Sequence, residues 1–191
     1  QPQNITEALI TKYCKNVSSS LPEPFTIMLP VRVKDMENFT WKVELRRCSI
    51  FLPHDWMRDL GVGATDVVWG HSKVKDFWAG HDVANDPCCR KLKGSDLNKT
   101  VPIIVHGDGG SFQRNDSMMV ISMRSLLSDA NVAHSQVLLA AIPKKCVNKS
   151  SDESLDTMKC LWKALSWSFS ALSEGIQPSK DNENKAFDKS S

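Results

Sequence analysis

With 191 residues, the chain is long enough for one domain, or for one domain with an appendage. Hydrophobic residues make up 41% of it and charged residues 24%, which is ordinary for a globular protein, and no apolar run approaches the length of about 18 that indicates a membrane span. The net charge of +2 and the pI of about 8.2 exclude a strong overall basic footprint for nucleic acid, where a pI above roughly 9 is expected.

The first segments predict irregular structure followed by two short strands. Residues 1–24 are expected to form a weakly ordered lead-in, and the start at Gln1 without Met or a leader indicates either a removed signal or an excised piece. Alternating apolar residues predict a strand over Ile27–Val33, which Pro30 restricts to an edge or a bend. A second alternation begins at Trp41.

Two short helices are predicted next. Pro53 can open a helix at its first turn, and Trp56 and Leu60 then fall on one face. A second helical stretch, Ser72–Ala79, also places its apolar residues on one side. Residues 80–99 are polar and predict a loop.

The second half of the chain predicts three strands. Val101–Val105 is apolar and β-branched, and it is expected to end at a glycine loop over residues 106–110. Ser117–Met123 and Val137–Ile142 are the second and third strands, and Pro143 ends the third. The short link between the first two favours an antiparallel hairpin.

The clearest helix follows these strands. Ser150 and Glu153 have the spacing of a capping box, and Gly175 followed by Pro178 supplies a stop. The tail, residues 179–191, is polar and expected to fray. The helical stripe of apolar residues at three- and four-residue steps is Leu155, Met158, Trp162, Leu165, Phe169 and Leu172.

Asp108 is the strongest single candidate for a functional residue. A carboxylate just past a buried strand is held rigidly and still reaches solvent, and the flanking Gly107 and Gly109 leave room for a ligand. Such an oxygen ligand suits Mg²⁺. The alternative is a simple turn, since Asp-Gly is a common turn dipeptide.

Basic and aromatic residues offer local contacts to DNA. The basic clusters are Arg46–Arg47, Arg90–Lys93 and Lys144–Lys145, although short basic pairs are also common on solvated loops. Tryptophans can stack on bases, but core packing is the simpler explanation for those on periodic faces. The six are Trp41, Trp56, Trp69, Trp78, Trp162 and Trp167.

Cysteines, histidines and sequons leave a second possibility open. Adjacent cysteines and the nine-residue gap between the two histidines do not have usual zinc spacing, so His71, His81, Cys88 and Cys89 predict no zinc site. Six cysteines permit three disulfides in a secreted chain, but their irregular spacing favours buried thiols. Six glycosylation sequons favour secretion; they begin at Asn4, Asn16, Asn38, Asn98, Asn115 and Asn148.

A series of short motifs runs from Leu52 to the end of the long helix. They are Leu52–Trp56, Phe77-Trp78 with Asp86-Pro87, His106–Gly109, Ser117–Leu127, Ser135–Pro143 and Trp162–Gly175. Together they resemble a repetitive mobile-element protein family of protist genomes, and they are also similar to the Plavaka-type transposases. The resemblance covers roughly two thirds of the chain.

This resemblance implies an α/β fold with a partial ribonuclease-H-like core, in which three antiparallel strands lead into a helix. The core would occupy residues 99–178, after the lead-in and a mixed α+β N-terminal region over residues 25–98. Asp108 would be the first of three metal-binding acids, acting catalytically with Mg²⁺ or Mn²⁺. The other two acids would lie on later elements, beyond Ser191, so the set in this chain is expected to be incomplete.

Three functions follow as hypotheses. The first is a fragment of a transposase-like protein that binds DNA, has no membrane partner, lies in the nucleus and needs the missing C-terminal part. Two-metal chemistry requires several carboxylates, so we expect this fragment to be inactive alone and the intact protein to be a DNA transposase or nuclease. The second is a secreted or surface glycoprotein that binds a partner. The third is a non-catalytic interaction domain that has kept the fold and lost the chemistry.

Overall fold

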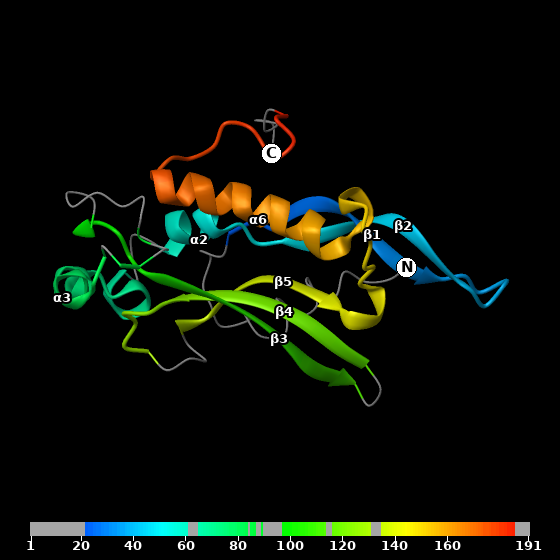
Figure 1. Cartoon of the computed structure of the whole chain (residues 1–191), viewed down its shortest axis with the longest axis horizontal. Coiled ribbons are helices and arrows are strands. Elements are labelled where there is room, and N and C mark those ends of the chain that lie inside the picture. Colours follow the sequence, from blue (N-terminus) through cyan, green and yellow to red (C-terminus); the bar gives the residue numbers. More distant parts are fainter. Residues whose placement is uncertain are drawn as a thin grey trace. The chain divides into compact units, whose positions relative to one another are not determined.

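The computed structural model describes residues 22–60, 65–83, 85–86, 89, 97–113, 116–130 and 135–185. The protein is a mixed α/β protein with two antiparallel sheets and several helices (Figure 1). One sheet contains strands β1 and β2, and the other has the order β3-β4-β5. The expected α/β class and the antiparallel pairing of neighbouring strands are therefore confirmed. Most of the predicted lead-in and the end of the tail lie outside the described residues.

The chain divides into two compact units that interleave along the sequence. Unit 1 contains residues 1–59, 107–121 and 138–191, and unit 2 contains residues 60–106 and 122–137. The chain passes between the units within β3, β4 and β5, so each of these strands has residues in both. No described helix is both long enough and apolar enough to cross a bilayer.

In unit 1, β1 (Phe25–Lys34) and β2 (Trp41–Ile50) form a hairpin whose register runs from Phe25 opposite Ile50 to Lys34 opposite Trp41. Asp35 shapes the turn, because its carboxylate accepts hydrogen bonds from the backbone N–H of Glu37 (2.9 Å) and Asn38 (3.4 Å). These two bonds lower the pKa of Asp35.

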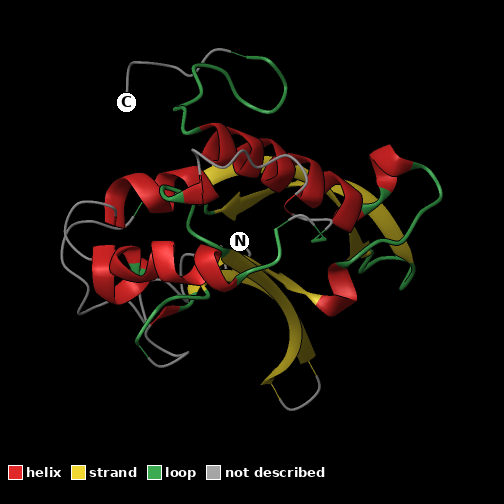
Figure 2. Ribbon diagram, turned by 60° about the vertical axis from the view of Figure 1, so that its left-hand side comes forward, coloured by secondary structure: helices red, strands yellow, loops and turns green. Residues whose placement is uncertain are grey.

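Pro30 lies within β1, opposite Leu45, in a sheet of two strands, which agrees with the edge prediction. A single antiparallel bridge also joins Val31 of β1 to Val147. Its carbonyl is used by another element: it accepts the hydroxyl hydrogen of Thr157, the first residue of α6 (Thr157–Glu174). The 18-residue α6 therefore packs along the hairpin (Figure 2).

The contact between the hairpin and α6 is apolar at its centre. Ile27, Leu29 and Ile50 are buried on the hairpin, and Leu161 and Leu165 are buried on α6. Trp167 falls outside the predicted stripe, yet it also packs against the hairpin. Its ring lies 6.1 Å from that of Phe25.

The start and the buried face of α6 correct the sequence prediction. Asp156, not Ser150, caps the helix: its carboxylate accepts from the backbone N–H of Lys159 (2.9 Å). Glu153 lies in a separate 3-10 turn, η5 (Glu153–Leu155). The end is as predicted, with Gly175 in the left-handed region at φ 67°. The buried residues of the helix are Thr157, Leu161, Ala164, Leu165, Ser168 and Ala171.

Helix α2 (Pro53–Leu60) was correctly predicted and lies against β5 (Val137–Pro143). The indole N–H of Trp56 donates to the carbonyl of Leu138 at 2.9 Å, and just before the helix the backbone N–H of Phe51 donates to Leu139 at 2.8 Å. The 3-10 turn η4 (Lys144–Cys146) follows β5 directly.

The glycine segment of β3 (Ile103–Gln113) is the largest departure from the sequence prediction. Residues 106–110 do not form a loop: they continue the strand, which pairs with β4 (Asp116–Ser125). Glycine disfavours strands by its chain entropy, but hydrogen bonding to the neighbouring strand β4 offsets this cost. Asp108 is therefore a mid-strand residue.

Unit 2 has a small core of its own. A π-helical turn, η1 (Thr65–Trp69), and a 3-10 turn, η2 (His71–Lys73), lead into the predicted short helix α3 (Val74–Gly80). The core cluster consists of Val74, Trp78, Cys89 and Leu127.

Candidate functional site

Asp108, the residue predicted to bind metal, is exposed on β3. Its Oδ1 accepts the backbone N–H of Gly109 at 2.6 Å. Within the described residues, the one group of three or more potential metal-ligating side chains lies elsewhere. The neighbours of Asp108 that are described therefore do not fit a two-metal centre, which requires several carboxylates.

The basic pair after β5, Lys144 and Lys145, contacts residues of β3 and β4. Lys145 Nζ forms an ion pair with Asp116 Oδ2 at 2.6 Å, and the side chain of Lys144 passes over Gly109, in the space that a Cβ would take. The charge of Lys145 is therefore matched by a carboxylate. The basic segment Arg90–Lys93 lies outside the described residues.

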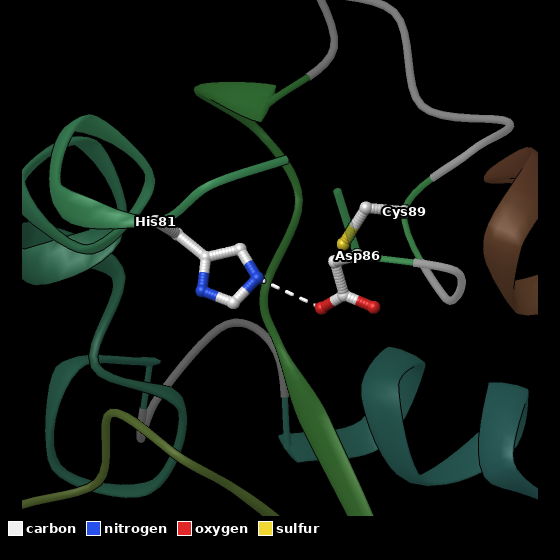
Figure 3. Close-up of side chains that lie close together, drawn as sticks. All are labelled: His81, Asp86 and Cys89. Carbon is white, nitrogen blue, oxygen red and sulfur yellow. Dashed lines mark hydrogen bonds and ion pairs between the residues drawn. The ribbon is translucent and has the colours of Figure 1, made fainter. Parts of the chain in front are cut away.

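Three side chains of unit 2 converge just after α3 (Figure 3). They are His81, Asp86 and Cys89, whose nearest ligand atoms all lie within 4.8 Å of one another. His81 Nε2 is 2.8 Å from Asp86 Oδ2. Cys89 is buried, whereas the other two are partly exposed. A nitrogen, an oxygen and a sulfur donor thus share one site, and the chemistry of this set suits a borderline-soft cation.

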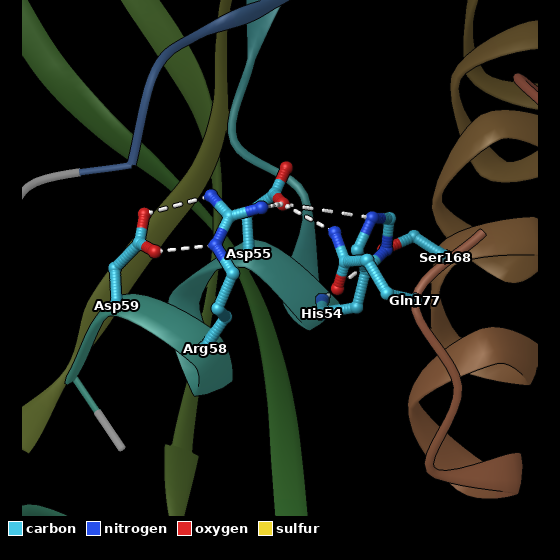
Figure 4. A network of polar contacts seen from close by, with 6 residues as sticks. All are labelled: His54, Asp55, Arg58, Asp59, Ser168 and Gln177. Carbon is cyan, nitrogen blue, oxygen red and sulfur yellow. Dashed lines mark hydrogen bonds and ion pairs between the residues drawn. The ribbon is translucent and has the colours of Figure 1, made fainter. Parts of the chain in front are cut away.

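A polar network in unit 1 joins α2 to α6 and resembles a Ser-His-Asp arrangement (Figure 4). His54 Nδ1 lies 2.7 Å from Ser168 Oγ, and His54 Nε2 lies 3.7 Å from Asp55 Oδ1. Asp55 also accepts from Gln177 Nε2 at 3.2 Å and pairs with Arg58 at 2.8 Å.

Burial decides against catalysis by this network. Ser168 is fully buried and His54 is 4% exposed, so no substrate carbonyl can approach the hydroxyl. Ser168 Oγ also accepts from the backbone N–H of His54 at 3.3 Å. Because the imidazole is buried, its pKa is lowered and it stays neutral at pH 7. The network is therefore a structural connection between α2 and α6.

The described cysteines outside the cluster are poor nucleophiles. Burial raises the pKa of the Cys48 thiol to about 11, and it also raises the pKa values of Cys146 and Cys160. All three are thiols.

The remaining candidate is one side of the β1–β2 hairpin, which we call the outer face. Side chains alternate between the two sides of a strand, and directly opposite residues share a side. By this register the outer face contains Met28, Arg32, Lys34, Trp41, Val43, Leu45 and Arg47, and Phe39 adjoins it from the turn.

The outer face is both apolar and basic. Trp41 is 45% exposed and Phe39 is 70% exposed. The three cations of the outer face, Arg32, Lys34 and Arg47, are also exposed. The guanidinium of Arg32 lies over the Trp41 ring at 5.0 Å, and Lys34 Nζ lies over the Phe39 ring at 5.4 Å. None of its strand positions carries a carboxylate.

The opposite side of the hairpin behaves differently. There Glu44 forms ion pairs with Lys42 (2.8 Å) and Arg46 (2.5 Å). The cations of the outer face form no such pair with any described residue. Arg46 and Arg47 were predicted as one basic cluster, but they point to opposite sides of β2. Arg46 pairs with Glu44, whereas Arg47 forms no ion pair with a described residue.

Sequence reasoning reached part of these sites. As possible zinc ligands, His81 and Cys89 were considered with His71 and Cys88, but Asp86 falls in a stretch that the sequence predicts only as a loop. The spacing of His81, Asp86 and Cys89 within that loop was the signal for the cluster. The tryptophans also divide: Trp56, Trp69 and Trp78 are buried, whereas Trp41 and Trp162 are exposed.

The comparisons with known proteins add no assignment to this geometry. No protein-family model, curated protein or solved structure matches the chain.

Proposed function

We propose that this chain is the DNA-binding part of a transposase-like, mobile-element-derived protein, and that its contact surface is the outer face of the β1–β2 hairpin. The observation that carries the proposal is the combination of exposed Trp41 and Phe39 with Arg32, Lys34 and Arg47, which form no ion pair with a described residue, on strand positions without acids. The substrate we assign is single-stranded DNA.

Stacking supports this choice of substrate. Proteins that bind single strands combine cations along the backbone path with aromatic rings on which bases stack. Each ring here has a cation over one side, Arg32 over Trp41 and Lys34 over Phe39. We propose that a base stacks on the exposed part of each ring, while the cation contacts a neighbouring phosphate.

The backbone at the tip of the hairpin also supports a binding role. Phe39 has φ 55°, a left-handed conformation that is unfavourable for a bulky residue. A hydrogen bond from the backbone N–H of Asp35 to the carbonyl of Thr40 (2.7 Å) closes the turn around it. Strained positions that persist in a tight turn often display a functional side chain, and this one displays an exposed ring.

The wider assignment rests on the resemblance and on the order of elements. Strands β3, β4 and β5 are neighbours in that order and are followed by α6, which is the order that a ribonuclease-H-like core requires. Asp108 lies on the first of these strands. We assign it as one acid of a metal site that this chain does not complete by itself, and we expect no strand cleavage or joining by the isolated chain.

Binding to a fluorescein-labelled oligodeoxythymidine, followed by anisotropy at low salt, tests the proposal. Base stacking contributes about 1–3 kcal/mol per base, so we expect Trp41→Ala to weaken binding by about fivefold to a hundredfold. Trp162→Ala is the matched control, because Trp162 is exposed on α6, away from the outer face, and we expect it to bind as the wild type does.

Adjacent arginines provide the control for charge. Arg47→Gln removes an unpaired cation of the outer face and should lower the slope of log affinity against log salt by about 0.7. Arg46→Gln removes a cation that pairs with Glu44 on the other side and should leave the slope unchanged. Equal losses from both variants, or no binding by the wild type, would contradict the proposal. Self-association that disappears in Trp41→Ala would assign the face to a protein contact instead.

A further inference from the structure

The cluster of His81, Asp86 and Cys89 lies in unit 2 and has no part in the proposed DNA surface. Its three donors come from one nine-residue stretch: His81 directly follows α3, Asp86 lies five residues on, and Cys89 three residues further. Ligands this close in sequence are typical of structural metal sites in short loops.

Backbone hydrogen bonds fold this stretch toward the site. The N–H of Val83 donates to His81 (2.9 Å), that of Asp86 to Asp82 (3.2 Å), and that of Cys89 to Asp86 (3.0 Å). The donors are therefore held close together by the chain itself, which lowers the ordering cost of binding a cation.

Aromatic packing fixes the imidazole. The His81 ring stacks on Phe77 at 5.4 Å with an interplanar angle of 14°, and it meets the edge of Trp78 at 5.5 Å. The indole N–H of Trp78 in turn donates to the carbonyl of Thr100 at 2.7 Å. The ring is thereby oriented with Nε2 toward Asp86 and the thiol of Cys89 (Figure 3).

The geometry points to a Zn²⁺ site formed by His81 Nε2, a carboxylate oxygen of Asp86 and the thiolate of Cys89, with water as the fourth ligand. Zn²⁺ prefers four ligands and accepts nitrogen, oxygen and sulfur donors together. Without metal, His81 Nε2 and Asp86 Oδ2 share a hydrogen bond. Binding of the cation replaces the hydrogen of this bond and also releases the proton of the Cys89 thiol. Because Cys89 also belongs to the core cluster with Val74, Trp78 and Leu127, the ion ties the loop to that core.

Co²⁺ is the probe, since a cobalt–thiolate bond gives a near-ultraviolet charge-transfer band and tetrahedral Co²⁺ gives visible bands. The full chain, reduced and without a polyhistidine tag, is titrated with Co²⁺ and then with Zn²⁺. We expect both bands to saturate at one Co²⁺ per chain and Zn²⁺ to remove them. Affinity should rise with pH, because the ligands bind in their deprotonated forms.

Variants identify the ligands. Asp86→Asn changes a partly exposed residue, so we expect its circular dichroism spectrum to match that of the wild type. This variant should weaken Co²⁺ binding at least tenfold. Cys89→Ser should abolish the charge-transfer band, whereas Cys160→Ser and Cys88→Ser should keep it. No band in the wild type, an unchanged titration of Asp86→Asn, or loss of the band in Cys88→Ser would overturn the site. If Cys89→Ser does not fold, the Asp86→Asn titration decides alone.

Discussion

The imidazole of His54 on α2 and the hydroxyl of Ser168 on α6 lie 2.7 Å apart, in a place that solvent does not reach. The contact holds two elements that are 114 residues apart in the sequence. Its geometry is satisfied when Ser168 donates to Nδ1 and accepts from the backbone of His54. Burial disfavours the charged imidazole, so the stability of unit 1 should depend on pH.

Burial lowers the pKa of His54 below its ordinary value of 6.5, so between those two pKa values the unfolded chain binds more protons than the folded one. The stabilising contribution is complete above pH 6.5 and is lost as the pH falls toward the lower folded value. We expect the free energy of unfolding, measured in urea, to fall between pH 7.5 and pH 5. In His54→Asn this fall should be shallower. An identical pH dependence in both proteins would show that His54 is not the group responsible.

Asp156 is expected to stabilise α6 in a way that Glu153 does not. Its carboxylate accepts the backbone N–H of Lys159 (2.9 Å) and of Ser150 (3.1 Å), whereas the carboxylate of Glu153 lies 3.5 Å from Lys159 Nζ and caps no backbone N–H among the described residues. Asp156→Ala leaves two backbone donors without partners, so it should lower the melting temperature by several degrees. Glu153→Ala is the control and should change it little; the reverse order would restore the capping box predicted from the sequence.

This helix also shows how far the sequence alone can lead. Its existence and its end at Gly175 were predictable from periodicity and stop signals. The buried face was not predictable, because the predicted apolar stripe and the residues that are in fact buried both recur at three- and four-residue steps. The larger set, with Trp162 and Leu155, is partly exposed, while the smaller residues Ala164, Ser168 and Ala171 are buried. Small side chains let α6 approach its neighbours closely, and this choice depends on what lies opposite.

The hairpin shows the same limit for function. The alternation that begins at Trp41 predicts a strand correctly, but alternating apolar residues usually face a core. Here that side is exposed, and only the pairing with β1 places Arg32 and Lys34 among them. For Asp108, the glycines predicted a loop, and cross-strand pairing to β4 made a strand instead. In each case the missing information was which residues of the neighbouring strand lie opposite.

Two glycines are expected to respond oppositely to alanine. Gly70 has φ 65°, and a Cβ there would lie 2.6 Å from the Cβ of Leu127 and 2.7 Å from its carbonyl carbon, so Gly70→Ala should destabilise the protein by about 2 kcal/mol or more. At Gly109 the new Cβ meets only the flexible end of Lys144, and Gly109→Ala should cost less than about 1 kcal/mol. Urea unfolding measures both, and equal costs would contradict this description of the two sites.

Phe39 should show a conflict between stability and binding. Phe39→Asn places a residue that tolerates positive φ at this turn and relieves about 1–2 kcal/mol of backbone strain, while it loses about 0.5–1 kcal/mol from the contact with Lys34. We expect the free energy of unfolding to rise by up to about 1 kcal/mol and the affinity for oligodeoxythymidine to fall. A variant that is less stable and binds DNA normally would show that the ring serves folding alone.

Mapping where DNA contacts the chain tests directly whether the outer face is the DNA-binding surface. A bromodeoxyuridine-substituted single strand is crosslinked to the protein by ultraviolet light, and the modified tryptic peptide is identified by mass spectrometry. If the outer face binds DNA, crosslinks should form in the peptide Asp35–Lys42, which contains both Phe39 and Trp41. Crosslinks in Cys160–Lys163, which contains Trp162, with none in Asp35–Lys42 would contradict this proposal.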